Sequence, residues 1–481
     1  MPRTARIALV LTLFALAAPS FAAAALRMPV GFEDDPTFRW SPNAPAELDK
    51  AAQANASIVR TTVSWATIAA TKPKHAARWN DPAYNFNDLD AFVRNAQERG
   101  LDVMMTIWGT PSWANGGQAP NVPPKSAVQL RLFAHALADR YSGRHPGLPY
   151  VGFYSIWNEP NLGIFLSTQF DKKGRIISPR IYANLYKQGR IGIKQVNKTA
   201  QIAIGETSNM GRDHPSKGGG PVSVAPATFA RLLAQQKGLY FDAYAEHPYS
   251  TRPNLPPTQR VRWPNVTLSR LKQFETSIDK WFHRKDIPVW VTEYGYQTKP
   301  ATKYGVSLAQ QRSYMSKVMR ELRADPRVQM FIWFIFRDTP SKAGEQPNWQ
   351  SGLFTRAGHT KPAYRTFSAL GSLINGYSQT IRPRVPALVT LHLPRMAYTD
   401  PVGTPIGLTY KVYEGAKLVA IGQPQVPLRP DATVKFAAVF SPDPGATYTI
   451  EMTANDANGN SVTHTYALLP ASSKAAAKKK H

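Results

Sequence analysis

The stretch VGFYSIWNEP, residues 151–160, indicates the fold of this chain most directly. Its apolar first half is typical of a buried strand, and the polar Asn158 and Glu159 are typical of the loop that follows such a strand. The apolar segment Ile287–Thr292 runs in the same way into Glu293. The sequence therefore predicts two buried strands, each with a glutamate at its carboxyl end.

Apolar β-rich segments of this kind recur throughout the first part of the chain. Their starts lie about 30 to 50 residues apart, which leaves room for a helix and two loops between neighbours. Near-continuous apolar strands suit a parallel sheet that is covered on its faces. Eight such units predict a (β/α)₈ TIM barrel over residues 26–375. The eight expected strands are Met28–Phe32, Ser57–Val63, Leu101–Trp108, Val151–Trp157, Gln201–Gly205, Leu239–Ala245, Ile287–Thr292 and Val328–Phe336.

The segments between these strands carry helical signals. Residues 87–100, 126–141 and 178–197 have helical periodicity and begin with Asn or Ser, residue types that favour helix starts. Ser307 and Gln310 have the spacing of a capping box. We therefore expect α-helices between the strands.

The character of the sequence changes after the predicted barrel. We predict a signal peptide at residues 1–25, a linker at 376–386, an immunoglobulin-like or fibronectin-like β-sandwich at 387–470 and a disordered Lys-rich tail at 471–481. The β-sandwich can bind glycan, space the barrel from a surface or cap one side of the barrel. Its expected strands are Leu388–Leu393, Ile406–Tyr413, Ala432–Phe440, Tyr448–Ala454 and Val462–Leu468.

The first residues predict export. Arg3 and Arg6 precede a short apolar run, Ile7–Ala18, and small residues suited to signal peptidase follow. An uncleaved anchor is the alternative, but the run is shorter than the roughly 20 residues that span a bilayer. We expect a secreted, monomeric protein with no stable membrane insertion after cleavage. Since the chain has no cysteine, it can form neither disulfides nor thiolate ligands and nucleophiles.

The chain is strongly basic, with 58 Lys and Arg residues, 31 Asp and Glu residues and a net charge of +27. Such a balance favours contact with anionic surfaces, for example an anionic cell-wall polymer. A basic solvated surface without a specific partner explains it equally well. The sequence contains no recognisable nucleic-acid module, and we predict no nucleic-acid partner.

Polar and aromatic side chains gather where the predicted strands end. Because the active site of such a barrel lies at the carboxyl ends of its strands, these side chains are expected to converge. Two glutamates there can act as the acid and as the nucleophile or base of glycosidic bond hydrolysis. Indole rings suit the C–H faces of sugars. The candidates are Arg60, Trp108, Trp113, Asn158, Glu159, Glu206, His247, Tyr249, Glu293, Trp333 and Trp349.

These motifs resemble the active-site signature of the retaining clan A glycoside hydrolases, especially families 39 and 5. The resemblance rests on Trp157–Asn161, His247–Tyr249, Thr292–Gly295 and Trp333, and it covers about residues 26–374. Many family 5 enzymes have a histidine at the end of the third strand. This chain has Ile107–Pro111 there, which favours a family 39-like assignment.

The resemblance implies a role for each matching residue. Glu159 would be the general acid and then the general base, and Glu293 would be the nucleophile. Asn158 would donate a hydrogen bond to the sugar 2-OH. Tyr249 and Arg60 would keep Glu293 ionised, His247 would orient either glutamate, and Trp333 would offer a flat face to a sugar ring. Because two carboxyl groups suffice for this chemistry, no cofactor and no metal are expected.

Several alternatives remain open from the sequence. Glu206 can bind a sugar hydroxyl or be an ordinary loop residue. The acidic run Glu33-Asp34-Asp35 can bind a cation or a sugar hydroxyl, or it can be a solvated loop. A catalytically silent carbohydrate-binding or wall-associated protein would keep the barrel, although it would have no need for both glutamates. A transglycosylase would use the same residues as a hydrolase.

Overall fold

The protein is described as a computed structural model. Its described residues in the first part of the chain are 28–99, 101–145, 148–216, 222–299, 305–339 and 349–375; those of the C-terminal part are 380–382, 387–392, 407–423, 433–438, 446, 448–455 and 461–470. The predicted signal peptide and the predicted Lys-rich tail lie outside them. Among the helices of these residues, none has the length and apolar character needed to cross a membrane.

Eight parallel strands close into a barrel in sequence order. Strand β1 pairs with β8 as well as with β2, and this pairing closes the barrel. The predicted (β/α)₈ barrel is therefore confirmed. The strands are β1 (Val30–Glu33), β2 (Ile58–Ser64), β3 (Asp102–Trp108), β4 (Phe153–Ile156), β5 (Gln201–Ser208), β6 (Ala243–His247), β7 (Val289–Tyr294) and β8 (Val328–Phe334).

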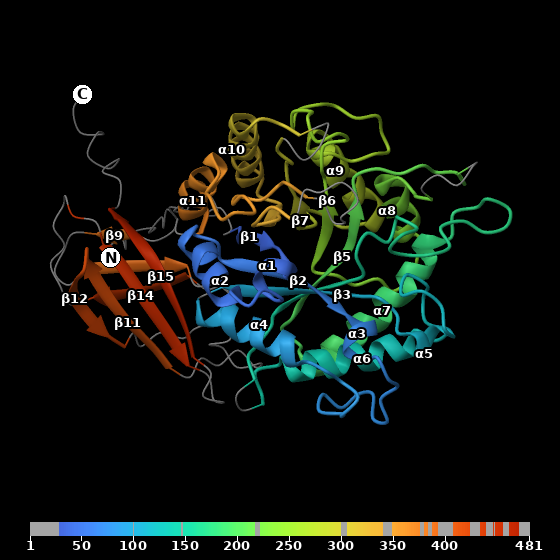
Figure 1. Ribbon diagram of the computed structural model, residues 1–481, viewed down its shortest axis with the longest axis horizontal. Helices are drawn as coiled ribbons and strands as arrows, with labels where there is room; N and C mark the ends of the chain where they lie inside the picture. The colour runs from blue at the N-terminus through green and yellow to red at the C-terminus, as the bar shows by residue number, and fades with distance from the viewer. Residues whose placement is uncertain are drawn as a thin grey trace, which may run out of the picture.

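Helices surround the barrel (Figure 1). The three predicted helical segments form α4, α6 and α7. The predicted capping box is present at the start of α10, where Ser307 and Gln310 exchange both hydrogen bonds. The helices are α1 (Asp35–Phe38), α2 (Ala44–Gln53), α3 (Trp65–Ile68), α4 (Asn87–Glu98), α5 (Ser112–Asn115), α6 (Val128–Arg140), α7 (Ser178–Val196), α8 (Pro226–Ala234), the 3₁₀ helix η1 (Leu268–Arg270), α9 (Leu271–Phe282), α10 (Leu308–Ala324) and α11 (Pro362–Asn375).

Alternate residues of the strands face opposite sides of the barrel wall. On β8, Met330 and Ile332 belong to the small cluster that fills the barrel. Phe331 and Trp333 belong to the larger cluster that also contains the buried faces of the helices. Because strand side chains alternate with a period of two, Phe334 points towards the inside of the barrel. This alternation decides which strand-end residues reach the barrel mouth.

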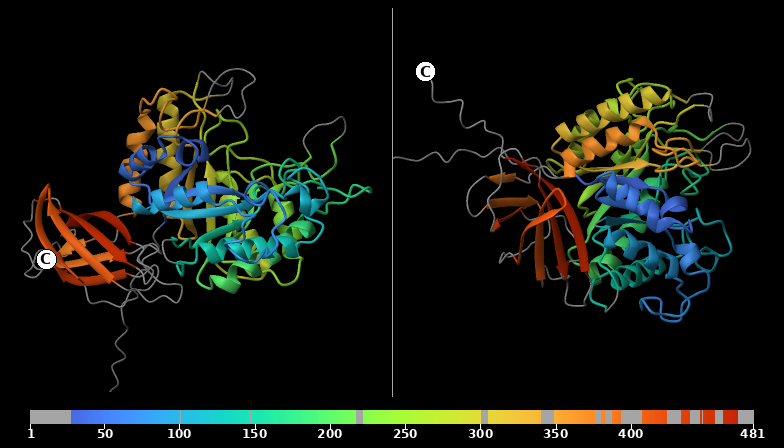
Figure 2. Two further views of the ribbon diagram at one scale, coloured as in Figure 1. Left: turned by 60° about the horizontal axis from the view of Figure 1, so that its bottom comes forward. Right: turned by 60° about the vertical axis from the view of Figure 1, so that its left-hand side comes forward.

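The C-terminal strands form a separate all-β unit beside the barrel, visible in both views of Figure 2. The sheet order is β12-β11-β14-β15-β9-β10-β13, and the end strands β12 and β13 also contact one another. Strand β9 falls within the predicted linker, and β15 contacts α4 of the barrel. The immunoglobulin-like or fibronectin-like class stays a prediction. The strands are β9 (Thr380–Arg382), β10 (Ala387–His392), β11 (Gly407–Glu414), β12 (Lys417–Gly422), β13 (Thr433–Ala438), β14 (Tyr448–Asn455) and β15 (Ser461–Pro470).

Candidate active site

The backbone that follows β4 has an unusual conformation at two residues. Trp157 and Glu159 have φ values of 73° and 37°, a region that residues with side chains rarely occupy. Two backbone hydrogen bonds fix this turn: the Trp157 amide donates to the Ile107 carbonyl at 2.7 Å, and the Glu159 amide donates to the Glu206 carbonyl at 3.0 Å. Backbone strain of this kind is concentrated at functional sites. Contacts from β3 and β5 therefore hold Glu159 in place.

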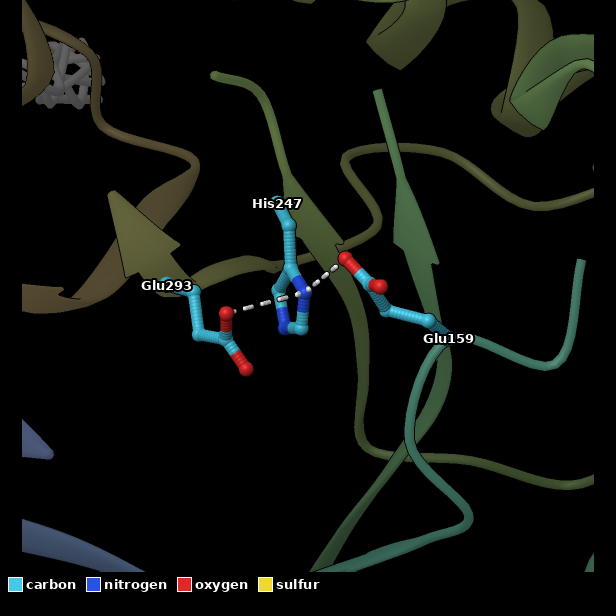
Figure 3. A group of neighbouring side chains, drawn as sticks. All are labelled: Glu159, His247 and Glu293. Carbon is cyan, nitrogen blue, oxygen red and sulfur yellow. Dashed lines mark hydrogen bonds and ion pairs between the residues drawn. The ribbon is translucent and has the colours of Figure 1, made fainter. Parts of the chain in front are cut away.

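Two carboxylates face one another across His247 at the mouth of the barrel (Figure 3). An oxygen of Glu159 and an oxygen of Glu293 lie within 4.8 Å of each other. The Nδ1 atom of His247 is 3.0 Å from Oε1 of Glu159 and 3.7 Å from Oε2 of Glu293. The other ring nitrogen, Nε2, is 3.1 Å from the hydroxyl of Thr292. The fully buried imidazole of His247 thus lies between the two glutamates, and the Thr292 hydroxyl of β7 fixes its other nitrogen.

The electrostatic surroundings of Glu293 favour its ionised form. Burial alone would raise the pKa of this carboxyl group, but the nearby charges of His247 and Arg60 lower it. Hydrogen bonds add to this effect: Nη1 of Arg60 donates to Oε1 at 2.9 Å, and the Tyr249 hydroxyl donates to Oε2 at 3.1 Å. The pKa of Glu293 consequently lies below its ordinary value.

The electrostatic surroundings of His247 favour its protonated form. Burial disfavours the imidazolium form of His247, but the charge of Glu293 and the hydrogen bond and charge of Glu159 outweigh that effect and raise the pKa of the histidine. A histidine with a raised pKa holds a proton between the two carboxylates over a wider pH range. It can therefore donate a hydrogen bond to Glu159 and neutralise part of the charge of the pair.

Arg60 on β2 connects several parts of the site. Its side chain is 0% exposed. Besides Glu293, it binds Oδ1 of Asn158 at 2.9 Å, Oε1 of Glu206 at 3.1 Å and the hydroxyl of Thr106 at 2.9 Å. The guanidinium also forms an ion pair with Glu33 of β1. A planar cation with five donors can fix several acceptors at once, and Arg60 sets the relative positions of Asn158 and Glu293 in this way.

The two glutamates line a cavity of about 530 Å³. This volume falls within the roughly 300–1,000 Å³ that is usual for sites that bind small ligands. The loops after β4 and β6 contribute to the wall, and Phe334 and Trp349 add aromatic surface. The lining includes Glu33, Asn158, Glu159, Tyr249, Glu293, Phe334 and Trp349.

The structure brings six of the eight predicted site residues together: Arg60, Asn158, Glu159, His247, Tyr249 and Glu293. Trp108 and Trp333 do not line the cavity. Trp108 packs edge-on against Phe165 and donates to its carbonyl at 3.1 Å. Trp333 is fully buried, packs against Tyr294 and donates to the Ser351 carbonyl at 2.8 Å. Trp333 therefore has no exposed face for a sugar ring, because the alternation of β8 turns its side chain away from the cavity.

Among the lining residues that the sequence analysis missed or left open are Phe334 and Glu33. Phe334 follows Trp333, and the register of β8 in the barrel decides which of the two rings faces the cavity. Glu33 belongs to the acidic run whose role was open, and its neighbours are structural. Asp34 accepts the amides of Phe336 and Arg337 at 3.1 and 2.9 Å, and Asp35 accepts the Thr62 amide at 3.0 Å.

The group Glu159, His247 and Glu293 also has the spacing of possible metal ligands, since one ligand atom from each lies within 4.8 Å of the others. Arg60 already contacts one oxygen of the Glu293 carboxylate at 2.9 Å. A metal cation at this point would be repelled by the guanidinium. The arrangement fits acid–base and nucleophilic chemistry better than metal binding.

Replacement of Tyr249 by phenylalanine is expected to shift the pH profile of the enzyme. The Tyr249 hydroxyl donates to ionised Glu293, so its loss raises the pKa of Glu293 towards the ordinary value. The acidic limb of kcat/KM should then move to higher pH, because Glu293 becomes protonated more readily. Activity measured from pH 3 to 8 checks this prediction.

A matched control for that variant is Tyr294→Phe. Tyr294 stacks on Tyr249 with ring centroids 5.9 Å apart, but its hydroxyl faces Tyr296 instead of Glu293. Its replacement should leave the acidic limb in place. An equal shift in both variants would show that packing, and not the hydrogen bond to Glu293, sets the profile.

Comparison with known proteins agrees with the class that this fold and site define, the clan A glycoside hydrolases. The family model "Cellulase (glycosyl hydrolase family 5)" matches residues 24–336. The chain therefore belongs to glycosyl hydrolase family 5 and is a retaining glycoside hydrolase. This is the second of the two families that the sequence resembled, so the missing histidine after the third strand does not exclude family 5. No curated protein matches the chain.

Solved structures share the fold at low sequence identity. A family 39 glycoside hydrolase from Bacteroides cellulosilyticus WH2 is 16% identical with a TM-score of 0.52, covering 86% of this chain and 81% of its own. A GH5_18 protein from Streptomyces cattleya in complex with Manb1-4GlcNAc is 16% identical with a TM-score of 0.52, covering 74% and 84%. A glucosidase from Croceicoccus marinus is 13% identical with a TM-score of 0.52, covering 86% and 94%.

Proposed function

We propose that this protein is a secreted glycoside hydrolase that cleaves O-glycosidic bonds of a poly- or oligosaccharide by double displacement, with Glu293 as nucleophile and Glu159 as general acid and base. The main support for this proposal is the spacing of the two carboxylates, which have oxygen atoms within 4.8 Å of each other. Retaining enzymes place these groups about 5–5.5 Å apart, and inverting enzymes place them about 6.5–9.5 Å apart to admit a water molecule. The spacing therefore favours direct attack by a carboxylate on the sugar.

The assignment of the two roles follows from the unequal surroundings of the carboxylates. Arg60 and Tyr249 both donate to Glu293, so Glu293 is the group that stays ionised and can attack the anomeric carbon. Glu159 has only His247 as a side-chain partner among the described residues. A protonated Glu159 can pass its proton to the leaving oxygen and later remove a proton from the water that releases the sugar.

Two further groups suit the sugar itself. Arg60 donates a hydrogen bond to Oδ1 of Asn158 and so fixes the orientation of the amide. The Nδ2 group of Asn158 can then donate a hydrogen bond to the sugar 2-OH. Phe334 and Trp349 line the cavity and pack against each other edge-to-face, with ring centroids 5.2 Å apart. Such rings offer apolar faces for the C–H groups of a pyranose. These two residues take the place that the sequence analysis gave to Trp333.

The first test is the release of reducing ends from a panel of plant, fungal and bacterial polysaccharides by the purified full-length chain. At least one neutral poly- or oligosaccharide should yield new reducing ends. Binding to a polysaccharide without any release would instead support the silent carbohydrate-binding alternative. Products longer than the substrate would show a transglycosylase.

We also propose that the basic exterior holds the protein on an anionic cell-wall polymer, because its net charge is +27. Retention on such a polymer should weaken several-fold as salt rises from about 20 to 150 mM, since exposed charges are screened over about 8–10 Å at physiological strength. A cosedimentation assay at graded salt checks this. Retention that is independent of salt would contradict it.

A further inference from the structure

Glu33 is a third carboxylate in the lining of the cavity, and it has no role in the proposed double-displacement mechanism. It ends β1 and lines the cavity together with Glu159 and Glu293. Its side chain is 9% exposed and forms an ion pair with Arg60. The Thr62 hydroxyl donates to its Oε1 at 3.3 Å. The ion pair with Arg60 compensates the burial of this carboxylate, and its place in the cavity lining lets its oxygens accept hydrogen bonds from a bound ligand.

Negative groups outnumber positive groups around this cavity. The guanidinium of Arg60 is shared by Glu33, Glu206 and Glu293. The other positive group, the imidazole of His247, lies between Glu159 and Glu293, so four carboxyl groups face two cations among the described residues. Among the described residues that line the cavity there is no Lys, Arg or His. The sign is opposite to that of the whole chain, whose net charge is +27. A carboxylate on a bound sugar would therefore meet like charge in a partly dehydrated site, where such contacts are strongly unfavourable.

We propose that Glu33 is a specificity-determining residue, which accepts hydrogen bonds from hydroxyl groups of the sugar in the cavity and excludes sugars that carry a carboxylate, such as uronic acids. An ionised carboxylate has acceptors but no donor, so sugar hydroxyls are suitable partners and a uronate is not. The inference rests on the proposed function, because it assumes that the sugar occupies this cavity. The substrate class it names is an uncharged glycosyl residue.

The test compares a neutral aryl glycoside with the aryl uronide of the same stereochemistry, for the wild type and two variants. Glu33→Gln keeps the shape and removes the charge, so the preference for the neutral sugar, measured as the ratio of kcat/KM values, should fall about tenfold or more. The change should come mainly from KM of the uronide. Glu33→Asp keeps the charge, but its shorter side chain moves the carboxylate oxygens away from the sugar. The preference for the neutral sugar should therefore persist, while kcat/KM for that sugar falls.

Glu206→Gln is the matched control, because Glu206 also contacts Arg60 but does not line the cavity. Whatever its effect on the absolute rate, it should leave the preference within about threefold of the wild type. An unchanged preference in Glu33→Gln, or an equal change in Glu206→Gln, would overturn the proposal. Wild-type enzyme that uses the uronide as well as the neutral sugar would overturn it too.

Failure of the proposed function would look different, because the wild type would then turn over none of the glycosides in the panel. Calorimetric binding of the neutral sugar and its uronate would still test Glu33 in that case. Tighter binding of the neutral sugar, with the difference reduced by Glu33→Gln, would support the proposal. Equal binding of both sugars by the wild type would contradict it.

Discussion

Replacement of Glu293 by glutamine is expected to lower turnover on the order of 10⁴-fold or more, because the amide cannot attack the anomeric carbon. Glutamine fills the same volume, and its amide oxygen can still accept the hydrogen bond from Arg60, so the variant should fold. The measurement is kcat for an activated aryl glycoside, with circular dichroism to verify the fold.

A suitable control for this variant is Glu98→Gln, since the Glu98 side chain is 65% exposed and remote from the described cavity lining. Its turnover should stay within about twofold of the wild type, as expected for a surface substitution. More than about a tenth of the wild-type rate in purified Glu293→Gln would show that another group is the nucleophile.

Replacement of Glu159 by glutamine should have an effect that depends on the leaving group. Substrates with poor leaving groups need protonation, so their turnover should fall about 10²–10⁴-fold, the usual contribution of a general acid. The first step should be spared for an aryl glycoside that departs without a proton. The glycosyl-enzyme then accumulates, because no general base activates water to release the sugar.

Azide provides the second part of that experiment. As a small anionic nucleophile it needs no general base, so it should restore turnover of the activated substrate in Glu159→Gln and yield a glycosyl azide of retained configuration. Azide should not restore that turnover in Glu293→Gln, which forms no glycosyl-enzyme. Rescue in Glu293→Gln but not in Glu159→Gln would reverse the two assignments.

The barrel was predictable because its strands are buried on both faces and therefore stand out as apolar runs. Glu159 and Glu293 could be placed as well, since the carboxyl ends of parallel strands meet at one edge. Their partners Arg60, His247 and Tyr249 were found for the same reason. The signal peptide and the β-sandwich architecture of the C-terminal all-β unit stay predictions.

The residues that sequence reasoning misplaced depend on side-chain direction. Trp333 and Phe334 are neighbours, and only the register of β8 shows which ring faces the cavity. The register was ambiguous because the whole segment is apolar on both faces of the strand, which removes the period-two signal. Glu33 was ambiguous for a different reason. Three consecutive acidic residues have different surroundings: Glu33 lines the cavity, whereas Asp34 and Asp35 accept backbone amides. The sequence does not show which of the three faces the cavity.

The most direct test of the double-displacement mechanism is to identify the residue that carries the sugar. In a 2-deoxy-2-fluoro glycoside, the fluorine slows both the formation and the hydrolysis of the glycosyl-enzyme. An activated leaving group restores the rate of formation alone, so the glycosyl-enzyme accumulates and can be mapped by mass spectrometry of its peptides. We predict one added glycosyl group per chain, attached to Glu293. Attachment to Glu159, or a first product of inverted anomeric configuration with no adduct, would contradict the mechanism.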